Sequence, residues 1–499
     1  MEQLSFIADS NQNYLVDSFS ANGFAEDSAR KLLELKYAPK LEVTDLFNRQ
    51  SVSYQLSKKD KLHRWLKYKE GFSAELVNIL LDDMGADVGD IVLDPFIGSG
   101  TTSIVCQMRG INSIGYDIMP ISTVALKAKA AVMRFDVKEI DSLFKEIDSL
   151  EVPTGYDERM ESITITEYAY PDENDIFLRY MQDWLVICNY SDDAKNLLLL
   201  CIINALERGS YTSKSGQYLS WDSRSTKVKH ANEKRIKNGK KPLAKKTVRQ
   251  EIPYVKDVIL DELKNVIHDI QTIQRVSAQS SKATIDYINN SALLEIPKLP
   301  DDYIKGVITS PPYCNRYDYT RTYALELVYL GANEKTIKQM RQDLLSCTVE
   351  SKSKIEELRD YYSEIKRNEW FEEKLDLIIN NPAFKEIMCA LKKRKDNGDL
   401  NNTGVLKMVK GYFIELGLMY AELFRICKKG GKVAFVNDNV RYGGEVIPVD
   451  FLSCSFAESF GFKIDRIYAL KQMKGNSSQQ MGKFGRVALR KSITIWEKE

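Results

Sequence analysis

Two short runs hold the residues whose types and spacing are most specific for chemistry: LDPFIGSGTT at 93–102 and TSPPY at 309–313. The first run contains Gly98 and Gly100, and glycine lets a backbone turn at positive φ and approach a ligand closely. The second run offers a hydroxyl, an aromatic ring and two prolines, which leave carbonyl acceptors without amide donors. Together the runs could bind a small nucleoside ligand and hold an amino-bearing ring beside it.

The elements around the first run predict how it is positioned. Residues 91–93 are a short apolar run typical of a strand, and 101–108 begins an amphipathic helix, so the glycines lie between strand and helix. The run lacks both the full G-x-G-x-x-G spacing of a dinucleotide site and the Lys-Ser/Thr of a triphosphate loop. A second predicted strand at 111–116 ends at Asp117, where a carboxylate can accept from both ribose hydroxyls. The ligand implied is a nucleoside without a required pyrophosphate.

The second run follows a short β-type run at 306–308, so it lies at the carboxyl end of a strand, where open α/β sheets bind their ligands. Its prolines fix an extended backbone whose carbonyls can accept hydrogen bonds from an exocyclic amino group. Tyr313 can stack on a base that has been rotated out of its helix, at a gain of roughly 1 to 3 kcal/mol per base. The residue types therefore favour chemistry on the amino group of a nucleobase.

Both runs resemble motifs of one family. Residues 94–102 are similar throughout to the S-adenosylmethionine motif of DNA amino-methyltransferases, and 310–313 resembles the catalytic tetrapeptide of the same family. The resemblance implies an α/β fold, a Rossmann-like class I methyltransferase sheet with two long insertions, and it implies S-adenosylmethionine as cofactor and double-stranded DNA as substrate. Serine in the first place of the tetrapeptide is typical of enzymes that methylate N4 of cytosine, whereas aspartate is typical of adenine N6 enzymes. We therefore predict a site-specific DNA methyltransferase for cytosine N4.

The resemblance also implies the site residues. The predicted catalytic residues are Ser310, Pro311, Pro312 and Tyr313. The residues predicted to bind the cofactor are Phe72, Ser73, Asp94, Pro95, Phe96, Gly98, Ser99, Gly100, Thr101, Asp117 and Asn290. Phe72 and Ser73 belong to the segment 66–81, which resembles the family's methionine-pocket element. Asn290 follows the third predicted strand, where the family often has an acid that touches adenine; Asp286 and Glu295 are the other candidates for that contact.

These residues suggest how an amino group could be methylated. The lone pair of the exocyclic nitrogen is conjugated into the base, so acceptors at the Ser310 hydroxyl and the Pro311 carbonyl would localise it while Tyr313 holds the ring. Most of the rate would come from positioning and electrostatics. A covalent mechanism is not expected, because a nucleophilic cysteine would have to follow a proline and Cys314 follows Tyr313. The three histidines are far apart, so no metal site is predicted.

One segment is strongly basic although the net charge of the chain is only +1. Between 221 and 250 there are eleven Lys or Arg and two acidic residues, interleaved with aromatic and small polar residues. This mixture suits contacts to phosphates and base edges, and concentrated cations favour a polyanion. The residues predicted to bind DNA are Tyr218, Trp221, Arg224, Lys227, Lys229, Lys234 and Arg235.

The motifs predict a single sheet interrupted by insertions. An N-terminal helical extension is expected at 1–59, followed by a catalytic domain built from 60–130, 283–330 and 405–499. The insertion at 131–282 carries the basic segment and is the candidate target-recognition region, and a second, helical insertion is expected at 331–404. The segments 462–470 and 487–496 suit the terminal antiparallel pair that distinguishes methyltransferase sheets.

Composition sets the broad class. With 43% apolar and 28% charged residues, the chain is expected to be a soluble globular protein of about two to four structural units. It shows no membrane span, no basic and apolar leader, and eight cysteines without paired spacing, which favours a reducing cytoplasm. The resemblance further implies a cognate restriction endonuclease acting on the same site. Adenine N6 methylation of DNA, RNA base methylation and a catalytically inactive DNA-binding subunit remain open as alternatives.

Overall fold

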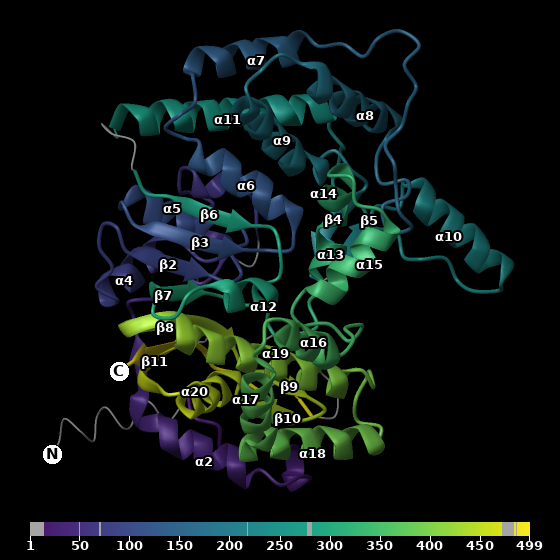
Figure 1. Cartoon of the computed structure of the whole chain (residues 1–499). Helices are drawn as coiled ribbons and strands as arrows, with labels where there is room; N and C mark the ends of the chain where they lie inside the picture. Colours follow the sequence, from purple (N-terminus) through teal and green to yellow (C-terminus); the bar gives the residue numbers. More distant parts are fainter. Residues whose placement is uncertain are drawn as a thin grey trace.

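The fold is described by a computed structural model that covers residues 14–48, 50–68, 71–216, 218–276, 282–471, 484–485 and 487–499. Figure 1 shows a central sheet with helices on both faces, a further layer of helices above it, and one helix, α10 (Thr226–Lys237), projecting to the side. No helix within these residues is long and apolar enough to cross a membrane.

Strand order in the sheet places the two sequence motifs side by side. Among the described residues the sheet has eight strands, in the order β1 (Leu41–Thr44), β11 (Phe462–Leu470), β12 (Lys491–Lys498), β8 (Cys427–Asp438), β7 (Ile304–Thr309), β2 (Ile91–Asp94), β3 (Asn112–Tyr116) and β6 (Ile285–Ile288). Strand β12 runs antiparallel to both of its neighbours, whereas the other pairings are parallel. The predicted Rossmann-like methyltransferase sheet is confirmed, with its terminal antiparallel pair.

Alternation along the strands decides which helices cover each face, because successive side chains point to opposite sides of a sheet. Val92 and Ile308 pack on one face, and their neighbours Leu93 and Val307 pack on the other. The helices of the first face are α4 (Ala74–Asp83) and α5 (Thr101–Met108), and those of the second are α12 (Ala292–Glu295), α19 (Val405–Ile426) and α20 (Val449–Ser459). Helix α19 is apolar nearly all round, as expected of a helix buried in the core.

The region 131–282, expected as an insertion, forms the upper layer of Figure 1 and the projecting helix. Its elements are α7 (Val137–Ser149), α8 (Asp172–Ile187), α9 (Asp192–Leu206), the hairpin β4 (Thr212–Ser215) and β5 (Tyr218–Trp221), then α10 and α11 (Val255–Val276). Helices α9 and α11 share an apolar core with α6 (Pro120–Ala130), which belongs to the sheet domain. The layer is therefore fused to the sheet and only α10 stands clear of it.

The region 331–404, predicted as an exposed helical insertion, is helical but partly buried. It forms α15 (Glu334–Asp343), α16 (Ile355–Glu364), α17 (Asn368–Asn380) and α18 (Pro382–Asp396), and it follows the short helices α13 (Tyr319–Thr322) and α14 (Ala324–Tyr329). Phe371 and Ile378 of α17 are fully buried against α19, in the same core as the sheet. One face of these amphipathic helices thus completes the core, and only the charged face is exposed.

The N-terminal region, expected to be helical, also supplies a strand. Residues 1–13 lie outside the described residues. The rest contains η1 (Ala21–Gly23), α2 (Ser28–Tyr37), η2 (Ala38–Lys40), β1 and α3 (Tyr54–Ser57), and η3 (His63–Trp65) follows at the start of the catalytic region. Strand β1 pairs in parallel with β11 and extends the sheet at its edge. Its four residues are too short a run to show strand periodicity, so tertiary pairing decides this structure.

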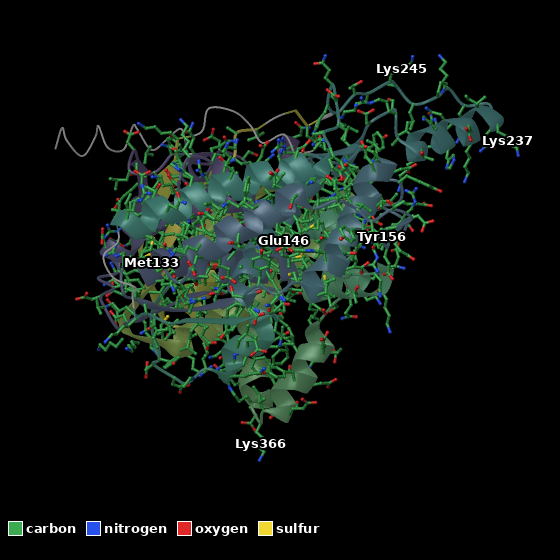
Figure 2. The ribbon with its side chains drawn as sticks, turned by 90° about the horizontal axis from the view of Figure 1, so that it is seen from above. Met133, Glu146, Tyr156, Lys237, Lys245 and Lys366 are labelled. Carbon is green, nitrogen blue, oxygen red and sulfur yellow. The ribbon has the colours of Figure 1, made fainter. Side chains whose placement is uncertain are left out.

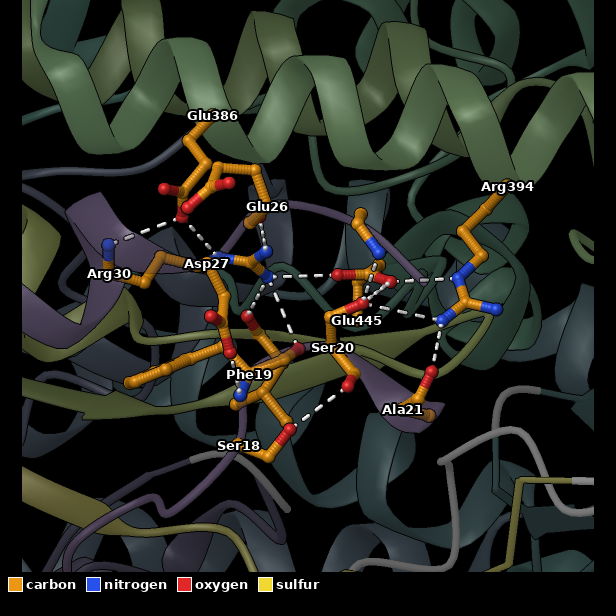
Figure 3. A network of polar contacts seen from close by, with 12 residues as sticks. Ser18, Phe19, Ser20, Ala21, Glu26, Asp27, Arg30, Glu386, Arg394 and Glu445 are labelled. Atoms are coloured by element: carbon orange, nitrogen blue, oxygen red, sulfur yellow. Dashed lines mark hydrogen bonds and ion pairs between the residues drawn. The ribbon is translucent and has the colours of Figure 1, made fainter. Parts of the chain in front are cut away.

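A buried ionic network fastens this region to the rest of the fold (Figure 3). Arg30 of α2 donates from Nε to Glu386 Oε1 of α18 at 2.8 Å, and its other nitrogen reaches Glu445 Oε2 at 3.1 Å. Arg394 of α18 donates to Glu445 Oε1 at 2.7 Å. Glu445 begins β10 (Glu445–Ile447), which pairs with β9 (Val440–Tyr442) beyond the end of β8. All four side chains are nearly fully buried, so each charge depends on its partners.

Replacing Arg30 by methionine should lower the free energy of unfolding by about 3 to 5 kcal/mol, because two carboxylates would lose a buried partner. Urea unfolding followed by circular dichroism would measure this. The control is Lys31→Met in the same helix turn, since Lys31 is half-exposed and pairs with the neighbouring Asp27, at 2.8 Å. That change should cost about 0 to 1 kcal/mol. Equal losses in the two variants would contradict the importance of the network.

Candidate active site

The turn after β2 and the segment after β7 are neighbours because these strands pair in parallel and end at the same edge of the sheet. Two glycines shape the turn, Gly98 with φ of 52° and Gly100 with φ of 82°. A Cβ added to Gly98 would lie 3.0 Å from the Tyr68 ring, and one on Gly100 would lie 2.7 Å from Leu126 Cδ1. Both the backbone angles and the close packing therefore require glycine.

Asp94 joins the two sequence motifs. Its Oδ2 accepts a hydrogen bond from Thr102 Oγ1 at 2.8 Å, and its Oδ1 accepts one from Thr309 Oγ1 at 2.7 Å. Thr102 ends the glycine-turn motif, and Thr309 begins the TSPPY run. The carboxyl group is buried, and this burial raises its pKa to about 6, although the bonds from both threonines act to lower it. One side chain thus fixes the spacing between the turn and the tetrapeptide.

Asp117, at the carboxyl end of β3, holds the turn from the other side. Its Oδ2 accepts from the Gly98 amide at 2.9 Å and from the Ser122 hydroxyl at 2.9 Å, and its Oδ1 accepts from the Met119 amide at 2.8 Å. Burial raises the pKa of this carboxyl group. The side chain that the sequence predicts to bind ribose therefore also orders the glycine turn.

A buried cation lies beneath the same turn. Lys129 of α6 is fully buried, and its Nζ donates to the Ser99 carbonyl at 2.7 Å. Burial lowers the pKa of this ammonium to about 7. The Ser99 hydroxyl, in turn, lies 3.3 Å from Thr101 Oγ1. Both the backbone and the side chain of Ser99 are thus held by hydrogen bonds.

A pocket, here called the central pocket, opens between the two motifs. The predicted cofactor residues that line it are Phe72, Pro95, Phe96, Gly98, Ser99, Thr101, Asp117 and Asn290. The predicted catalytic residues that line it are Ser310 and Pro312. A ligand in the central pocket would therefore touch both motifs.

Three predicted cofactor residues stand behind the pocket wall, and their contacts explain why. Ser73 is the N-cap of α4, and its hydroxyl accepts from the Leu76 amide at 3.2 Å. Gly100 is the N-cap of α5. Asp94 is occupied by the two threonines. These residues shape the central pocket without lining it.

The three candidates for the adenine contact, Asn290, Glu295 and Asp286, differ in their position relative to the central pocket. Asn290 lines the central pocket and donates its amide to Glu295 Oε1 at 2.5 Å. Glu295 is buried and also bonds Lys298, at 2.7 Å, while Asp286 is exposed on the edge strand β6. Of these three side chains, only that of Asn290 is in position to meet a ligand in the central pocket.

Sequence reasoning did not identify several residues that line the central pocket: Tyr68, Gly71, Ile97, Ile118, Met119, Ser291, Ala292, Leu293, Tyr319, Leu344 and Leu345. Most of them are neighbours of predicted residues, so proximity to a motif was an available signal. Leu344 and Leu345 are different, because they come from the region expected to be a separate helical insertion. No local pattern could have placed them here.

The tetrapeptide leaves the sheet at the end of β7. The Ser310 hydroxyl donates to the Tyr313 hydroxyl at 3.0 Å. Pro311 and Tyr313 are not among the lining residues of the central pocket, so the ring stands next to it and not within it. Burial raises the pKa of Tyr313 and raises that of the following thiol, Cys314, well above its usual value. A protonated, buried thiol is a poor nucleophile, in agreement with the expectation from the sequence.

The residues predicted to bind DNA divide into two groups. Three of the cationic side chains are committed to the protein itself. Arg224 makes paired bonds to Asp222 at 2.9 and 2.8 Å, which lower the pKa of that acid to about 2. Lys227 donates to the Thr164 carbonyl, and Arg235 donates to the Lys241 carbonyl at 2.8 Å. These side chains brace the hairpin and α10.

Three of the other four residues are exposed. Tyr218 is 56% exposed on the hairpin, whereas Trp221 is half-buried, with Lys227 Nζ 4.8 Å from its ring centre. Lys229 and Lys234 are exposed on α10. Residues 226–247, here called the basic arm, contain nine Lys or Arg and one acid. Figure 2 shows the basic arm, with Lys237 and Lys245 labelled, reaching away from the body of the molecule.

Comparisons with known proteins agree with this geometry. A family model described as DNA methylase, of the N6 and N4 type, matches residues 14–123. Type II methyltransferase M.BsoBI of Geobacillus stearothermophilus is 50% identical over 98% of this chain and 96% of its own length. Type II methyltransferase M.AvaI of Nostoc sp. is 34% identical over 96% of this chain and 95% of its own length. The similarity therefore extends over the insertions as well as the motifs.

The central pocket fits the methyl donor of this family. A carboxylate at Asp117 and the apolar side chains of Phe96 and Met119 suit a ribose and an adenine ring, and the close approach at Gly98 leaves room that any side chain would fill. The chain belongs to the family of DNA methyltransferases that modify exocyclic amino groups, of the N4 and N6 type, with S-adenosylmethionine as the methyl donor.

Proposed function

We propose that this protein methylates N4 of cytosine at a specific sequence in double-stranded DNA. The observation that carries the proposal is Ser310, a hydroxyl and not a carboxylate, which leads the tetrapeptide and lines the central pocket at the end of β7. The aspartate form of this motif is the one expected for adenine N6. Adenine N6 methylation is the second candidate, because both bases present an amino group next to a ring nitrogen acceptor.

The cofactor residues have separate tasks in this proposal. S-adenosylmethionine supplies an electrophilic methyl group on a positively charged sulfur. Asp117 would accept from the ribose hydroxyls, Asn290 would face the adenine, and Phe72 would pack against the methionine part. Gly98 and Ser99 would bring the backbone close to the ligand. Asp94 and Gly100 would act indirectly, because they hold the turn in its shape.

The tetrapeptide would position the base. A cytosine inside a duplex cannot reach the central pocket, so the base must be rotated out of its helix. The Ser310 hydroxyl and the Pro311 carbonyl would accept from the amino group and localise its lone pair, while the Tyr313 ring supports the base by stacking. Ser310 donates its proton to the Tyr313 hydroxyl, so the lone pairs of its oxygen stay able to accept from the amino group when the base arrives.

The basic arm would contact the DNA backbone. Its exposed lysines can neutralise phosphates, which gives affinity without reading the sequence. The hairpin lies between the arm and the catalytic segment, since β5 packs on α13. Tyr218, exposed on this hairpin, is the residue that we expect to approach the bases.

We further propose that the protein belongs to a restriction–modification system and that an endonuclease cuts the same site when it is unmethylated. The support is that its full-length relatives are described as Type II methyltransferases. Such a protein would work in the compartment that holds the DNA, the cytoplasm of a bacterial cell.

The product decides between the candidate functions. Tritiated methyl transfer is measured on in vitro amplified bacterial DNA and, in parallel, on in vitro transcribed RNA. Digestion of the DNA to nucleosides should give N4-methylcytosine as the labelled product. N6-methyladenine would keep the enzyme class and overturn the base assignment. Label in RNA but not DNA would favour an RNA methyltransferase. Bound cofactor with label in neither would indicate an inactive DNA-binding subunit.

The role of the glycine turn is tested by Gly100→Ala. This variant should bind S-adenosylmethionine about tenfold more weakly, because the new Cβ meets Leu126 Cδ1 at 2.7 Å and either this side chain, which packs against the turn, or the turn itself must shift. Gly85→Ala is the matched control: Gly85 also has a positive φ, 57°, but a Cβ there has no neighbour within 4 Å. Titration calorimetry measures both. A similar affinity in the two variants would show that the turn tolerates a side chain.

The role of the basic arm is tested by replacing Lys234, Lys237 and Lys245 with glutamine. DNA affinity should fall, and the slope of its logarithm against the logarithm of salt concentration should shrink by roughly 0.9 for each phosphate that a lysine no longer neutralises. A triple variant at Lys385, Lys393 and Lys395, which are exposed on the distant α18, removes the same charge and should leave the slope nearly unchanged. Equal slopes in the two triple variants would assign DNA binding to another surface.

A further inference from the structure

Lys491, the first residue of β12, lies beside the tetrapeptide although no sequence motif marks it. Its two neighbours in the chain point the other way, because Arg490 donates to Asp450 Oδ2 at 2.6 Å and Ser492 donates to the same oxygen at 3.0 Å. Alternation along the strand then turns Lys491 to the opposite side of the sheet. Hydrogen bonds from the residues on both sides hold the backbone here, so the Cα position of Lys491 is fixed.

The Lys491 side chain has two partners at the active-site edge of the sheet. It forms the last cross-strand pair of β12 and β8 with Asp438, with Nζ 3.5 Å from Oδ1. Nζ also lies 4.9 Å from the centre of the Tyr313 ring, within the range of a cation–π contact. The side chain is only 15% exposed. Burial alone would lower the pKa of Lys491, but Asp438 and Tyr313 outweigh it and raise the pKa, so the charge is kept.

We propose that Lys491 is a positioning residue for methyl transfer: its ammonium, aligned by Asp438, fixes the Tyr313 ring in the orientation that receives the target base. This inference rests on the proposed function, because it takes Tyr313 as the ring that supports the base. The ammonium lies against the Tyr313 ring, and the base would stack on the face of the ring opposite to it. Ser310 holds the hydroxyl of the same ring at 3.0 Å, so two contacts define its orientation.

The proposal explains why a costly buried charge stands at this place. A buried lysine next to one carboxylate gains little stability over an apolar pair. An aromatic ring that is already ordered, in contrast, loses little conformational entropy when the base binds, so the free energy of base binding is more favourable. The benefit is realised in the complex with DNA, and it should be lost when either the cation or the ring is removed.

The test is a double-mutant cycle on the full chain. Single-turnover transfer of tritiated methyl groups is measured with excess enzyme on in vitro amplified bacterial DNA. Lys491→Met should lower the rate about three- to tenfold, while Lys491→Arg should stay within about twofold of the wild type. In the Tyr313→Ala background, Lys491→Met should have no further effect, because the two residues act as one unit. The dissociation constant for S-adenosylmethionine should be the same in all variants.

Lys498→Met is a matched control. Lys498 ends the same strand, is also 15% exposed, pairs with Asp302 at 2.7 Å and lies 5.0 Å from the Phe424 ring. It is far from the tetrapeptide, so its replacement should leave the rate unchanged. An equal fall for Lys491→Met with and without Tyr313, or no fall at all, would overturn the proposal. The methylated base made by the wild type is identified in the same samples. An adenine product would contradict the proposed function, and the double-mutant cycle would then test the role of Lys491 in adenine methylation.

Discussion

The carboxyl group of Asp94 is the contact on which the site depends most. It receives one hydroxyl from the helix that follows the glycine turn and one from the strand that leads into the tetrapeptide. Transfer requires the methyl group and the amino nitrogen to be held in line at about 3 to 3.5 Å. Here the two elements that would bind the methyl donor and the base are joined through one buried group. Burial raises the pKa of Asp94, and the bonds from the two threonines act against this shift. Asp117 and Lys129 then fix the turn from its remaining sides.

Much of the fold and part of the site could be predicted from the sequence because their signals are local. The glycine turn, the tetrapeptide and the strands that lead into them are defined by consecutive residues, and the structure brings them together at one edge of the sheet. Strand β1 and the pocket residues Leu344 and Leu345 gave no such signal, because their positions follow from packing between distant parts of the chain. Ser73 and Gly100 were expected at the ligand, yet they serve the helices that frame it. Residue type predicted the segments that meet at the central pocket but did not tell which of their side chains line it.

The basic segment shows the same limit for charge. Counting lysines and arginines locates a cationic region but gives no information on which of them are already bound. Three of these cations, Arg224, Lys227 and Arg235, donate hydrogen bonds to acceptors within the protein, whereas the lysines farther along the basic arm are exposed. Of the committed cations, Lys227 ties α10 to the rest of the protein through the Thr164 carbonyl, and Arg235 bonds the Lys241 carbonyl within the basic arm. Structural and exposed cations therefore have complementary uses within one segment.

The ionic network around Arg30 has a consequence for how the protein is made. Arg30 and its partner Glu445 are 415 residues apart, and the edge strand β1 pairs with β11, which is also synthesised near the end of the chain. At a usual rate of translation, the N-terminal segment waits for roughly 20 to 80 seconds before these partners leave the ribosome. During that time a buried arginine of the finished protein is hydrated, and a future sheet strand has no neighbour. The sheet thus cannot be completed during synthesis. Strand β1 pairs with β11, and Arg30 meets Glu445, only after nearly the whole chain has been made.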